Sequence, residues 1–370
     1  MAQGDLAPQL SIIVPLLNEE DALPGLLASL LGQYGVHIEL ILCDGGSTDG
    51  TLEFCRQATS ARSLNARLVT APAGRGRQMN AAARVVSAAT LLFLHADSRF
   101  PSPFALSDAL AAYRMARSVS GPGPLAGHFR LCFSGPGADN AAYYYYACKA
   151  QSGRPGTIHG DQGFLVDSGS FRQLGGFSEA LPFLEDCRFA DRVLATGDWL
   201  LLPARILTST RRFHREGLLQ RQVLNALVMN FASIGWDLFF AEVPGLYREQ
   251  TATGRLQVLP FLNRIGELLA TLPVAERRRL WRRTGAYVRS QGWQLGLALD
   301  CRTNRRAGHP AGDGPTPWLH WFDRWFDRIT DHPPGRILTT VLVFCWFHLI
   351  RFRLTRRQLR AGATVGDRAL

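Results

Sequence analysis

The chain has 370 residues, of which 46% are hydrophobic and 19% charged, and its mean hydropathy is close to zero. This composition can bury a sizeable core, and it excludes disordered, collagen-like and coiled-coil proteins. The net charge of +11 is uneven: residues 1–250 hold 21 basic and 22 acidic side chains, whereas residues 251–370 hold 20 and 8. We therefore expect one domain over 1–250 and a basic, mainly helical extension over 251–370, the latter with a polyanionic partner.

The seven cysteines form no CxxC pair and show no zinc-ligand spacing. Residues Met1–Gln9 carry an acidic side chain and no basic one, and no apolar segment precedes a cleavage site. These features predict neither a disulfide framework nor a secretory signal. We expect a protein of the reducing cytoplasm.

The first third of the chain alternates apolar segments with amphipathic ones. Strands are predicted over Leu10–Pro15, Ile38–Cys43, Ala66–Thr70 and Thr90–Leu94, and a helix follows each of the first three. Strands this apolar are buried on both faces, which is typical of a parallel sheet with right-handed crossovers. Ligands of such sheets bind at the carboxyl ends of the strands.

Residues 125–250 show a mixed pattern, and the residues beyond 250 are predicted to be helical around a Pro/Gly-rich linker, Arg305–Pro317. The strand-like segments of the mixed region are Ala126–Phe133, Phe164–Asp167, Trp199–Leu202 and Arg205–Ser209. A helix is predicted to start near Glu185. The chain shows no internal repeat.

Asp44 ends the second predicted strand and opens the motif DGGSTDG. A carboxylate there can accept hydrogen bonds from a nucleobase or a ribose hydroxyl. The glycines allow close backbone approach, and Ser47 to Asp49 can cap the next helix. An ordinary strand–helix turn explains the glycines and the serine, but it leaves Asp44 without a role.

The third and fourth strands are followed by the motifs GRGRQMN and HADS. In the first, Arg75 and Arg77 lie at a helix start, where both the guanidinium groups and the helix N-terminus suit phosphate. A solvated basic loop is the alternative, and the spacing excludes a P-loop. In the second, Asp97 can hold Mg²⁺ or Mn²⁺ through one oxygen beside a diphosphate, or it can cap a helix.

Two later motifs carry acids. Asp161 and Gln162 lie in a glycine-rich loop and can face an acceptor or a sugar, although a loop with Asx turns explains them equally well. Glu185 and Asp186 begin a helix, where one carboxylate can act as a general base or both can be ordinary first-turn acids. Adjacent side chains at a helix start point in different directions, so we expect at most one to enter a cleft.

Farther on, the motif RRFH places Arg211, Arg212 and His214 together. Arg211 and Arg212 can clamp a phosphate, because guanidinium groups match phosphate oxygens. A surface basic patch is the alternative.

The order and spacing of these motifs are more specific than any one of them. Together SIIVPLLNEED, ILCDGGSTDGT, GRGRQMNAAA, LLFLHADS, GDQGFLV, LPFLEDCRFADRV and STRRFHREG resemble family 2 glycosyltransferases, from about Leu10 to Tyr247. That resemblance implies the GT-A fold, an α/β, Rossmann-like, mostly parallel sheet flanked by helices. The forms RGRQMN, LHADS and GDQ look most like the radical-SAM and selenodomain-associated branch, some of whose members are labelled arsenosugar-biosynthesis glycosyltransferases.

The resemblance implies an inverting transfer of a sugar from a nucleotide-diphosphate sugar to an acceptor hydroxyl, with Mg²⁺ or Mn²⁺ as the cation. By position, Asp97 would hold the cation, Asp186 would be the general base and Glu185 would orient the acceptor. The donor-binding residues that it implies, or that the motifs above indicate, are Pro15, Asn18, Glu19, Asp44, Arg75, Arg77, Asn80 and Asp97. Asp161, Gln162, Arg211, Arg212 and His214 are expected on the acceptor or phosphate side.

One departure from the family pattern concerns the metal. The first aspartate of the family's DxD motif is His95 in this chain. Either metal dependence is weaker, or another ligand compensates, with His214 as one candidate. Two alternatives remain open: a nucleotidyltransferase on a similar fold, and a non-catalytic sugar-nucleotide-binding or scaffold protein.

The basic extension contains two apolar helical patterns. One places six side chains on a single face: Trp318, Trp321, Phe322, Trp325, Phe326 and Ile329. The other is the 14-residue run Ile337–Ile350 with arginines on both sides. A span needs about 20 residues, so the run is short for a transmembrane helix. It suits a helix in an anionic membrane interface, or a pair of helices packed on the catalytic domain.

The expected location is therefore the cytoplasm, peripherally on the inner membrane face, where a lipid-linked acceptor fits. No nucleic acid is expected, because no nucleic-acid-binding module is recognisable.

Overall fold

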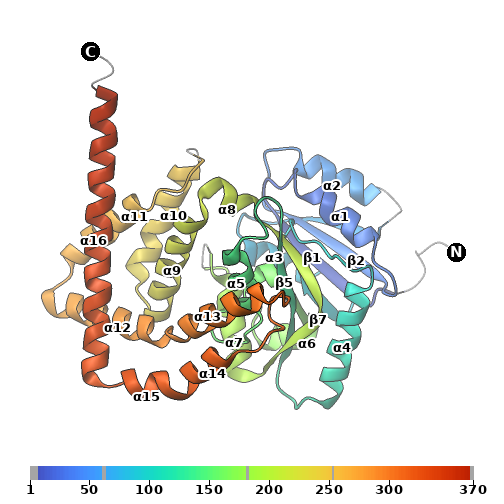
Figure 1. The fold of residues 1–370 in the computed structure, drawn as a ribbon. Coiled ribbons are helices and arrows are strands. Elements are labelled where there is room, and N and C mark those ends of the chain that lie inside the picture. The colour runs from blue at the N-terminus through green and yellow to red at the C-terminus, as the bar shows by residue number, and fades with distance from the viewer. Residues whose placement is uncertain (1–6, 61–63, 181–182, 252–253, 367–370) are drawn as a thin grey trace. The chain divides into compact units, whose positions relative to one another are not determined.

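The computed structural model describes residues 7–60, 64–180, 183–251 and 254–366 (Figure 1). They form two compact units, the first made of residues 1–210 with 310–313 and the second of residues 211–309 with 314–370. This division falls earlier than the predicted domain boundary after Gln250, which stays a prediction. Residues 1–6 of the N-terminal segment, and Leu181 and Pro182 of the LPFLED motif, lie outside the described residues.

The first unit is built on a seven-stranded sheet with the strand order β3-β2-β1-β4-β6-β5-β7. Strands β1 to β4 run parallel, β5 and β7 are parallel to each other, and β6 is antiparallel to both β4 and β5. The strands are β1 (Leu10–Leu16), β2 (Ile38–Asp44), β3 (Ala66–Thr70), β4 (Thr90–Phe93), β5 (Leu125–Ser134), β6 (Phe164–Asp167) and β7 (Asp198–Ser209). The predicted fold class is confirmed, and the two segments predicted within β7 form one strand.

Helices cover both faces of this sheet (Figure 1). Alternate residues of β1 explain why: Ile12 packs in the core with α1, α2 and α4, and Ile13 packs in the core with α3, α6 and α7. A strand that is buried on both faces has no polar side to show, hence the continuous apolar run. The helices are α1 (Leu23–Leu31), α2 (Thr51–Ser60), α3 (Arg75–Ala83), α4 (Ala105–Val119), α5 (Ala141–Ala150), the 3₁₀ turn η1 (Gly160–Gln162), α6 (Ser168–Gln173) and α7 (Glu185–Thr196).

The regular secondary structure of the second unit's described residues is helical, as predicted for the C-terminal extension. Its elements are α8 (Arg211–Glu216), α9 (Leu218–Ile234), α10 (Asp237–Thr251), α11 (Leu259–Thr271), α12 (Val274–Ser290), α13 (Trp293–Arg306), α14 (Pro317–Trp321), the π-helical turn η2 (Phe322–Phe326), α15 (Asp327–Thr330) and α16 (Pro333–Gly366). The predicted linker is non-helical from residue 307 to 316, and its residues 310–313 pack in the first unit, where Arg130 pairs with Asp313 at 2.8 Å.

One expectation about the second unit is wrong. The run Ile337–Ile350 lies inside a single helix of 34 residues, and its stretch Pro333–Arg360 is long and apolar enough to cross a membrane. The helix continues through the flanking arginines, because Phe352, Leu354 and Leu359 are interspersed with them. Length alone therefore does not exclude a membrane span.

Candidate active site

The carboxyl ends of β1 and β2 carry two loops that hydrogen-bond to each other. The Asn18 N–H donates to Ser47 Oγ at 3.0 Å, and Asn18 Oδ1 accepts the Thr48 N–H at 2.8 Å. The Glu19 N–H donates to Thr51 Oγ1 at 2.8 Å. Asn18 has φ 55°, a left-handed conformation that asparagine tolerates better than most residues. Asn18 and Glu19 thus lie beside the Asp44 loop, and their contact with a donor stays a prediction.

Asp44 is buried at the end of β2, and Pro15 of β1, which pairs with the preceding Cys43, is buried too. The Asp44 carboxylate accepts the N–H groups of Gly46 at 2.9 Å and Ser47 at 3.2 Å. Asp44 therefore has a structural role within the turn, which is to accept the N–H groups of the residues that follow it. The same bonds hold its carboxylate rigidly at the sheet edge where a ligand of a parallel sheet binds.

Gln78 is a positioning residue that the sequence analysis missed. Its buried amide on α3 donates to Leu16 O at 2.7 Å and to Cys43 O at 2.8 Å, tying the helix to the ends of β1 and β2. A Cβ on Gly45 would lie 2.9 Å from the Gln78 amide, so a glycine is needed there. The only indication of this role in the sequence was that Gln78 belongs to the GRGRQMN motif.

The other residues of this motif have different surroundings. Arg75 pairs through Nε with Glu185 Oε1 at 2.8 Å, and Arg77 is exposed. Asn80 donates to Phe177 O at 2.9 Å and to Glu179 Oε1 at 2.8 Å, and it accepts the Phe177 N–H. Its amide therefore holds the loop after α6, and that use competes with its predicted contact to the donor.

Glu185 and Asp186 begin α7, and both are buried. Asp186 accepts the Gly160 N–H and the Cys187 N–H, each at 2.8 Å, while Glu185 pairs with Arg75. Both carboxylates line one small cavity, so the expectation that at most one would enter a cleft is wrong. Glu185 is held by Arg75 of α3, and Asp186 is held by the N–H of Gly160 in η1.

That cavity has a polar side and an apolar side. His95, Gly160, Glu185 and Asp186 line the polar side, and the apolar lining consists of Met79, Phe93, Leu94, Phe164 and Phe177. A Cβ on Gly160 would lie 2.9 Å from His95 Nε2 and 3.2 Å from Asp186 Oδ2. Gly160 therefore allows the loop and the two side chains to meet.

Charges around the cavity shift the pKa values of its acids. Burial would raise the pKa of Asp186, but Arg75, His159 and the Gly160 N–H outweigh it and hold that pKa below the usual range. Burial raises the pKa of Asp161, and the negative charges of Asp186 and Asp97 raise it further against the opposing effect of His159. Asp97 and Asp186 thus both lie within electrostatic range of Asp161.

Asp161 and Gln162 differ in their hydrogen bonding. Asp161 Oδ1 is buried without a hydrogen-bond partner among the described residues. The buried Gln162 side chain donates to Thr157 O at 2.8 Å and thereby holds the loop, although its Oε1 likewise has no hydrogen-bond partner among the described residues. Asp161 is therefore the acid of this loop with a free buried oxygen for a ligand.

Three candidate ligand atoms lie close together beside the proposed catalytic acids. The candidate ligand atoms of His159, Asp186 and Cys187 lie within 4.8 Å of one another, and His159 Nδ1 is 3.2 Å from Cys187 Sγ. Carboxylate and imidazole donors of this kind can hold a divalent cation, and Asp161 adds a carboxylate to the same region. The buried, unpartnered Asp161 oxygen fits the same conclusion.

Arg211, Arg212 and His214 lie on α8 of the second unit. Arg212 pairs with Glu216 at 3.2 Å and donates to Tyr247 Oη at 2.9 Å. Arg212 is thus anchored inside its own unit. A contact between these residues and a phosphate stays a prediction.

Comparison with known proteins identifies the class of the first unit. Residues 11–119 match the family model for glycosyl transferase family 2. The "PGL/p-HBAD biosynthesis glycosyltransferase" proteins of Mycobacterium bovis and Mycobacterium tuberculosis are 39% identical over 94 residues, which are 25% of this chain and 36% of those relatives. Residues 11–119 of the first unit are therefore similar to family 2 glycosyltransferases, in agreement with the resemblance that the motifs indicated.

Two solved structures are similar at 16% identity and a TM-score of 0.46. One is Staphylococcus aureus TarS (residues 1–349) with UDP, where the match covers 81% of this chain and 92% of TarS. The other is the mannosyltransferase PcManGT of Pyrobaculum calidifontis with GDP-Man and Mn²⁺, where the match covers 94% of this chain and 87% of PcManGT. The chain spans little more than a third of the length of the curated relatives it matches. The proteins named above do not support the predicted assignment to the narrower radical-SAM-associated branch.

Proposed function

We propose that this protein is an inverting glycosyltransferase that uses a nucleotide-diphosphate sugar. The observation that carries the proposal is the arrangement around α3. Gln78 ties this helix to the Asp44 loop, and Arg75 at its start pairs with Glu185 beside Asp186. One helix thus links the proposed nucleoside end of the site to the proposed chemical end.

The residues divide the reaction between them. Asp44, with Pro15, Asn18 and Glu19, forms the nucleoside side, and Arg75 and Arg77 supply positive charge at a helix start for the diphosphate. Asp97, aided by Asp161 or His95, would hold Mg²⁺ or Mn²⁺, which would neutralise charge developing on the leaving diphosphate. Glu185 orients the acceptor.

Asp186 is the proposed general base. It accepts the proton of the acceptor hydroxyl while the acceptor oxygen bonds to the anomeric carbon and the bond to the diphosphate oxygen breaks on the opposite face. A single displacement of this kind inverts the anomeric configuration. Because Asp186 is ionised over a wide pH range, its carboxylate is always available, although its lowered pKa makes it a weak base.

Asp161 is a second candidate for the base. Its raised pKa lies closer to neutral pH, where a general base is most effective, and it has an unpartnered buried oxygen. The pH profile of kcat/KM separates the two. If Asp161 is the base, activity falls with decreasing pH already at pH values well above the ordinary aspartate pKa of about 3.9. If Asp186 is the base, activity stays constant over that pH range, because the pKa of Asp186 is lowered.

We also propose that the protein acts on the cytoplasmic side of a membrane, where the second unit binds anionic lipid and the acceptor is lipid-linked. The specific support is the exposed, apolar helix Pro333–Arg360, which is flanked and interrupted by arginines. No nucleic-acid partner is proposed.

The function is tested with the purified full chain. A thermal-shift screen of UDP-, GDP- and dTDP-sugars, with and without Mn²⁺, identifies the donor, and product analysis then shows whether the sugar is transferred with inversion. Asp186→Asn should abolish turnover while donor binding persists, whereas Asp108→Asn, an exposed acid on α4, should behave like the wild type. Release of pyrophosphate from a nucleoside triphosphate would instead indicate a nucleotidyltransferase, and donor binding without turnover a scaffold protein.

A further inference from the structure

One face of α16 is covered by other helices of the second unit. Trp281 on α12 contacts Phe344 and Phe347, with ring centroids 5.2 and 5.5 Å apart, and Phe347 is buried. Thr340 packs directly against Gly285 of α12, where any Cβ would clash. Farther along, Arg351 donates to Asn263 Oδ1 of α11 at 2.8 Å. The packed face therefore extends from Thr340 to Arg351.

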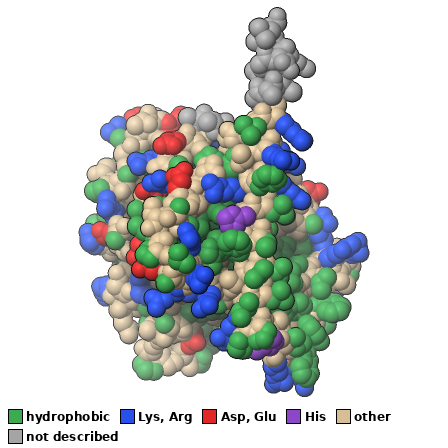
Figure 2. Space-filling view, turned by 90° about the vertical axis from the view of Figure 1, so that its left-hand side faces the viewer, with side chains coloured by type: hydrophobic (Ala, Val, Ile, Leu, Met, Phe, Trp, Pro, Cys, Tyr) green, Lys and Arg blue, Asp and Glu red, His purple; other side chains and the backbone are tan. Residues whose placement is uncertain are grey.

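The opposite face of α16 is apolar and open. Its exposed hydrophobic side chains, which we call the outer face, are Ile337, Leu338, Val341, Leu342, Trp346, Leu349 and Phe352. The preceding helices α14 and α15 and the turn η2 add Trp318, Trp321, Trp325 and Ile329, all exposed. Figure 2 shows hydrophobic side chains gathered along α16 and beside its lower part. An apolar surface of this extent is typical of an interaction site.

Positive charge borders this surface. Arg336 precedes the apolar stretch, Arg353, Arg356 and Arg357 follow it, and the chain carries no acidic residue from Gly335 to Gly366. Near η2, Arg324 and Arg328 lie over the Trp325 ring, each 5.4 Å from its centroid. Tryptophans with an arginine border are typical of helices in a membrane interface, where arginine binds anionic headgroups.

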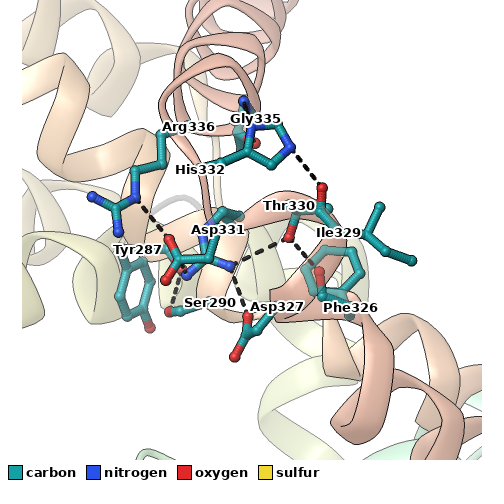
Figure 3. A network of polar contacts seen from close by, with 12 residues as sticks. Tyr287, Ser290, Phe326, Asp327, Ile329, Thr330, Asp331, His332, Gly335 and Arg336 are labelled. Atoms are coloured by element: carbon teal, nitrogen blue, oxygen red, sulfur yellow. Dashed lines mark hydrogen bonds and ion pairs between the residues drawn. The ribbon is translucent and has the colours of Figure 1, made fainter.

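The turn between α15 and α16 is fixed by ion pairs, which set the direction in which α16 leaves. Asp331 pairs with Arg336 at 2.7 Å and with Arg289 of α12 at 3.1 Å, and Arg289 also reaches Asp327 at 2.7 Å. Figure 3 shows Asp331 between Arg336 and the end of α15, with the His332 side chain bonded to Ile329 O. The start of α16 is therefore held onto α12 by charge as well as by packing.

From these observations we infer that α16 lies in the plane of an anionic membrane, with its outer face in the lipid and its packed face on α12, and does not cross the bilayer. The inference rests on the proposed membrane association. A crossing helix would carry α12 with it or separate from it. The first places arginines such as Arg278, Arg279 and Arg282 in hydrocarbon, where charged side chains are strongly disfavoured. The second exposes Phe347 and Trp281.

Cys345 offers a direct measurement of depth, because it lies on α16 and is the one exposed residue among the seven cysteines. The full chain, spin-labelled at Cys345, is mixed with sealed phosphatidylcholine vesicles containing 30% phosphatidylserine, and with vesicles lacking it. We expect binding to the anionic vesicles alone, a label about 5–10 Å below the headgroups, release by alkaline carbonate, and digestion of a C-terminal tag by external protease.

Different outcomes overturn different claims. Binding with a carbonate-resistant protein, a protected tag and a label near the bilayer centre would overturn the in-plane orientation and leave the membrane association standing. Failure to bind anionic vesicles would overturn both claims, and a concentration-dependent dimer in light scattering, with no vesicle binding, would assign the outer face to a second copy of the chain. Turnover of a soluble acceptor tests the proposed glycosyl transfer separately.

Variants locate the binding surface. Leu342→Glu with Trp346→Glu should reduce vesicle binding at least tenfold, because both side chains belong to the outer face. The matched control is Met115→Glu with Val119→Glu on α4, where two exposed apolar residues lie outside the outer face. Equal losses in both pairs would show that the effect is not specific to α16. Circular dichroism verifies that each variant keeps its helix content.

Discussion

The candidate site of the first unit and the outer face of the second unit use side chains in opposite ways. In the site, polar groups are buried and multiply bonded: Asp44 and Asp186 each accept two backbone N–H groups. On the outer face, large apolar side chains such as Leu342 and Trp346 are exposed. Chemistry requires fixed charges, whereas docking requires area and complementary charge. A single substitution in the site should therefore reduce turnover strongly, whereas a single substitution at the outer face should weaken membrane binding only in part.

The largest expected effect comes from Asp186→Asn. Loss of the proposed base should lower kcat at least 10³-fold with a soluble acceptor, while the donor Kd changes less than threefold and vesicle binding is unchanged. Initial rates and calorimetric donor titrations measure these quantities. A variant that keeps a tenth of wild-type kcat would remove Asp186 from the mechanism.

A second prediction concerns the stability of the sheet. Glu39 on β2 is fully buried and accepts hydrogen bonds from Ser11 Oγ and from the N–H groups of Ser87 and Ala88. Glu39→Ala would leave the Ser87 N–H and the Ser11 hydroxyl without their acceptor, whereas the Ala88 N–H would keep Ser11 Oγ at 3.0 Å. We expect a cost of about 3 kcal/mol in the free energy of unfolding, measured by urea denaturation. The control Glu53→Ala, an exposed partner of Arg56, should change it by less than about 0.5 kcal/mol.

The Glu39 prediction also has a pH dependence. Burial would raise the pKa of Glu39, but its hydrogen bonds outweigh burial and lower that pKa. Its contribution to stability is therefore fully present above the ordinary glutamate pKa of about 4.3 and is lost as the pH falls through the lowered value. A wild-type protein whose advantage over Glu39→Ala grows on acidification would contradict this assignment.

Arg75→Gln tests the link between α3 and the acids. Removing this cation should raise the pKa of Asp186, because burial is then opposed by fewer positive charges. We expect kcat/KM to fall about 10- to 100-fold and the acid side of its pH profile to move to higher pH. Arg84→Gln, which removes a well-exposed arginine after α3, is the control, and an identical pH profile in Arg75→Gln would break the proposed coupling.

The smallest effect is expected at the border of the outer face. Each of Arg353→Gln and Arg356→Gln should weaken binding to anionic vesicles about fivefold, since one arginine near such a surface contributes about 1 kcal/mol. The loss should shrink at high salt, and turnover of a soluble acceptor should stay at the wild-type level. Arg114→Gln on α4 is the matched control. A change in soluble turnover would contradict the separation between site and surface.

Local patterns in the sequence determined the strands β1 to β4, the α/β class and the motif loops, because runs such as Leu10–Pro15 depend only on burial of neighbouring residues. They also placed Asp44 and Asp97 at strand ends, since a strand that stops in a polar motif marks the ligand edge of a parallel sheet. The helical nature and the basic charge of the C-terminal region were also evident, because both depend only on the local sequence.

Only the tertiary structure decided which distant residues meet. The antiparallel insertion of β6 between β4 and β5 brings Gly160 and Asp161 to Asp186, and no periodicity along the chain records such a pairing. The Gln78 bonds to Leu16 and Cys43 are likewise non-local. For α16, the sequence determined an apolar helix with arginine borders, but packing on α12 decided which face stays open, because burial of one face depends on a partner elsewhere in the chain.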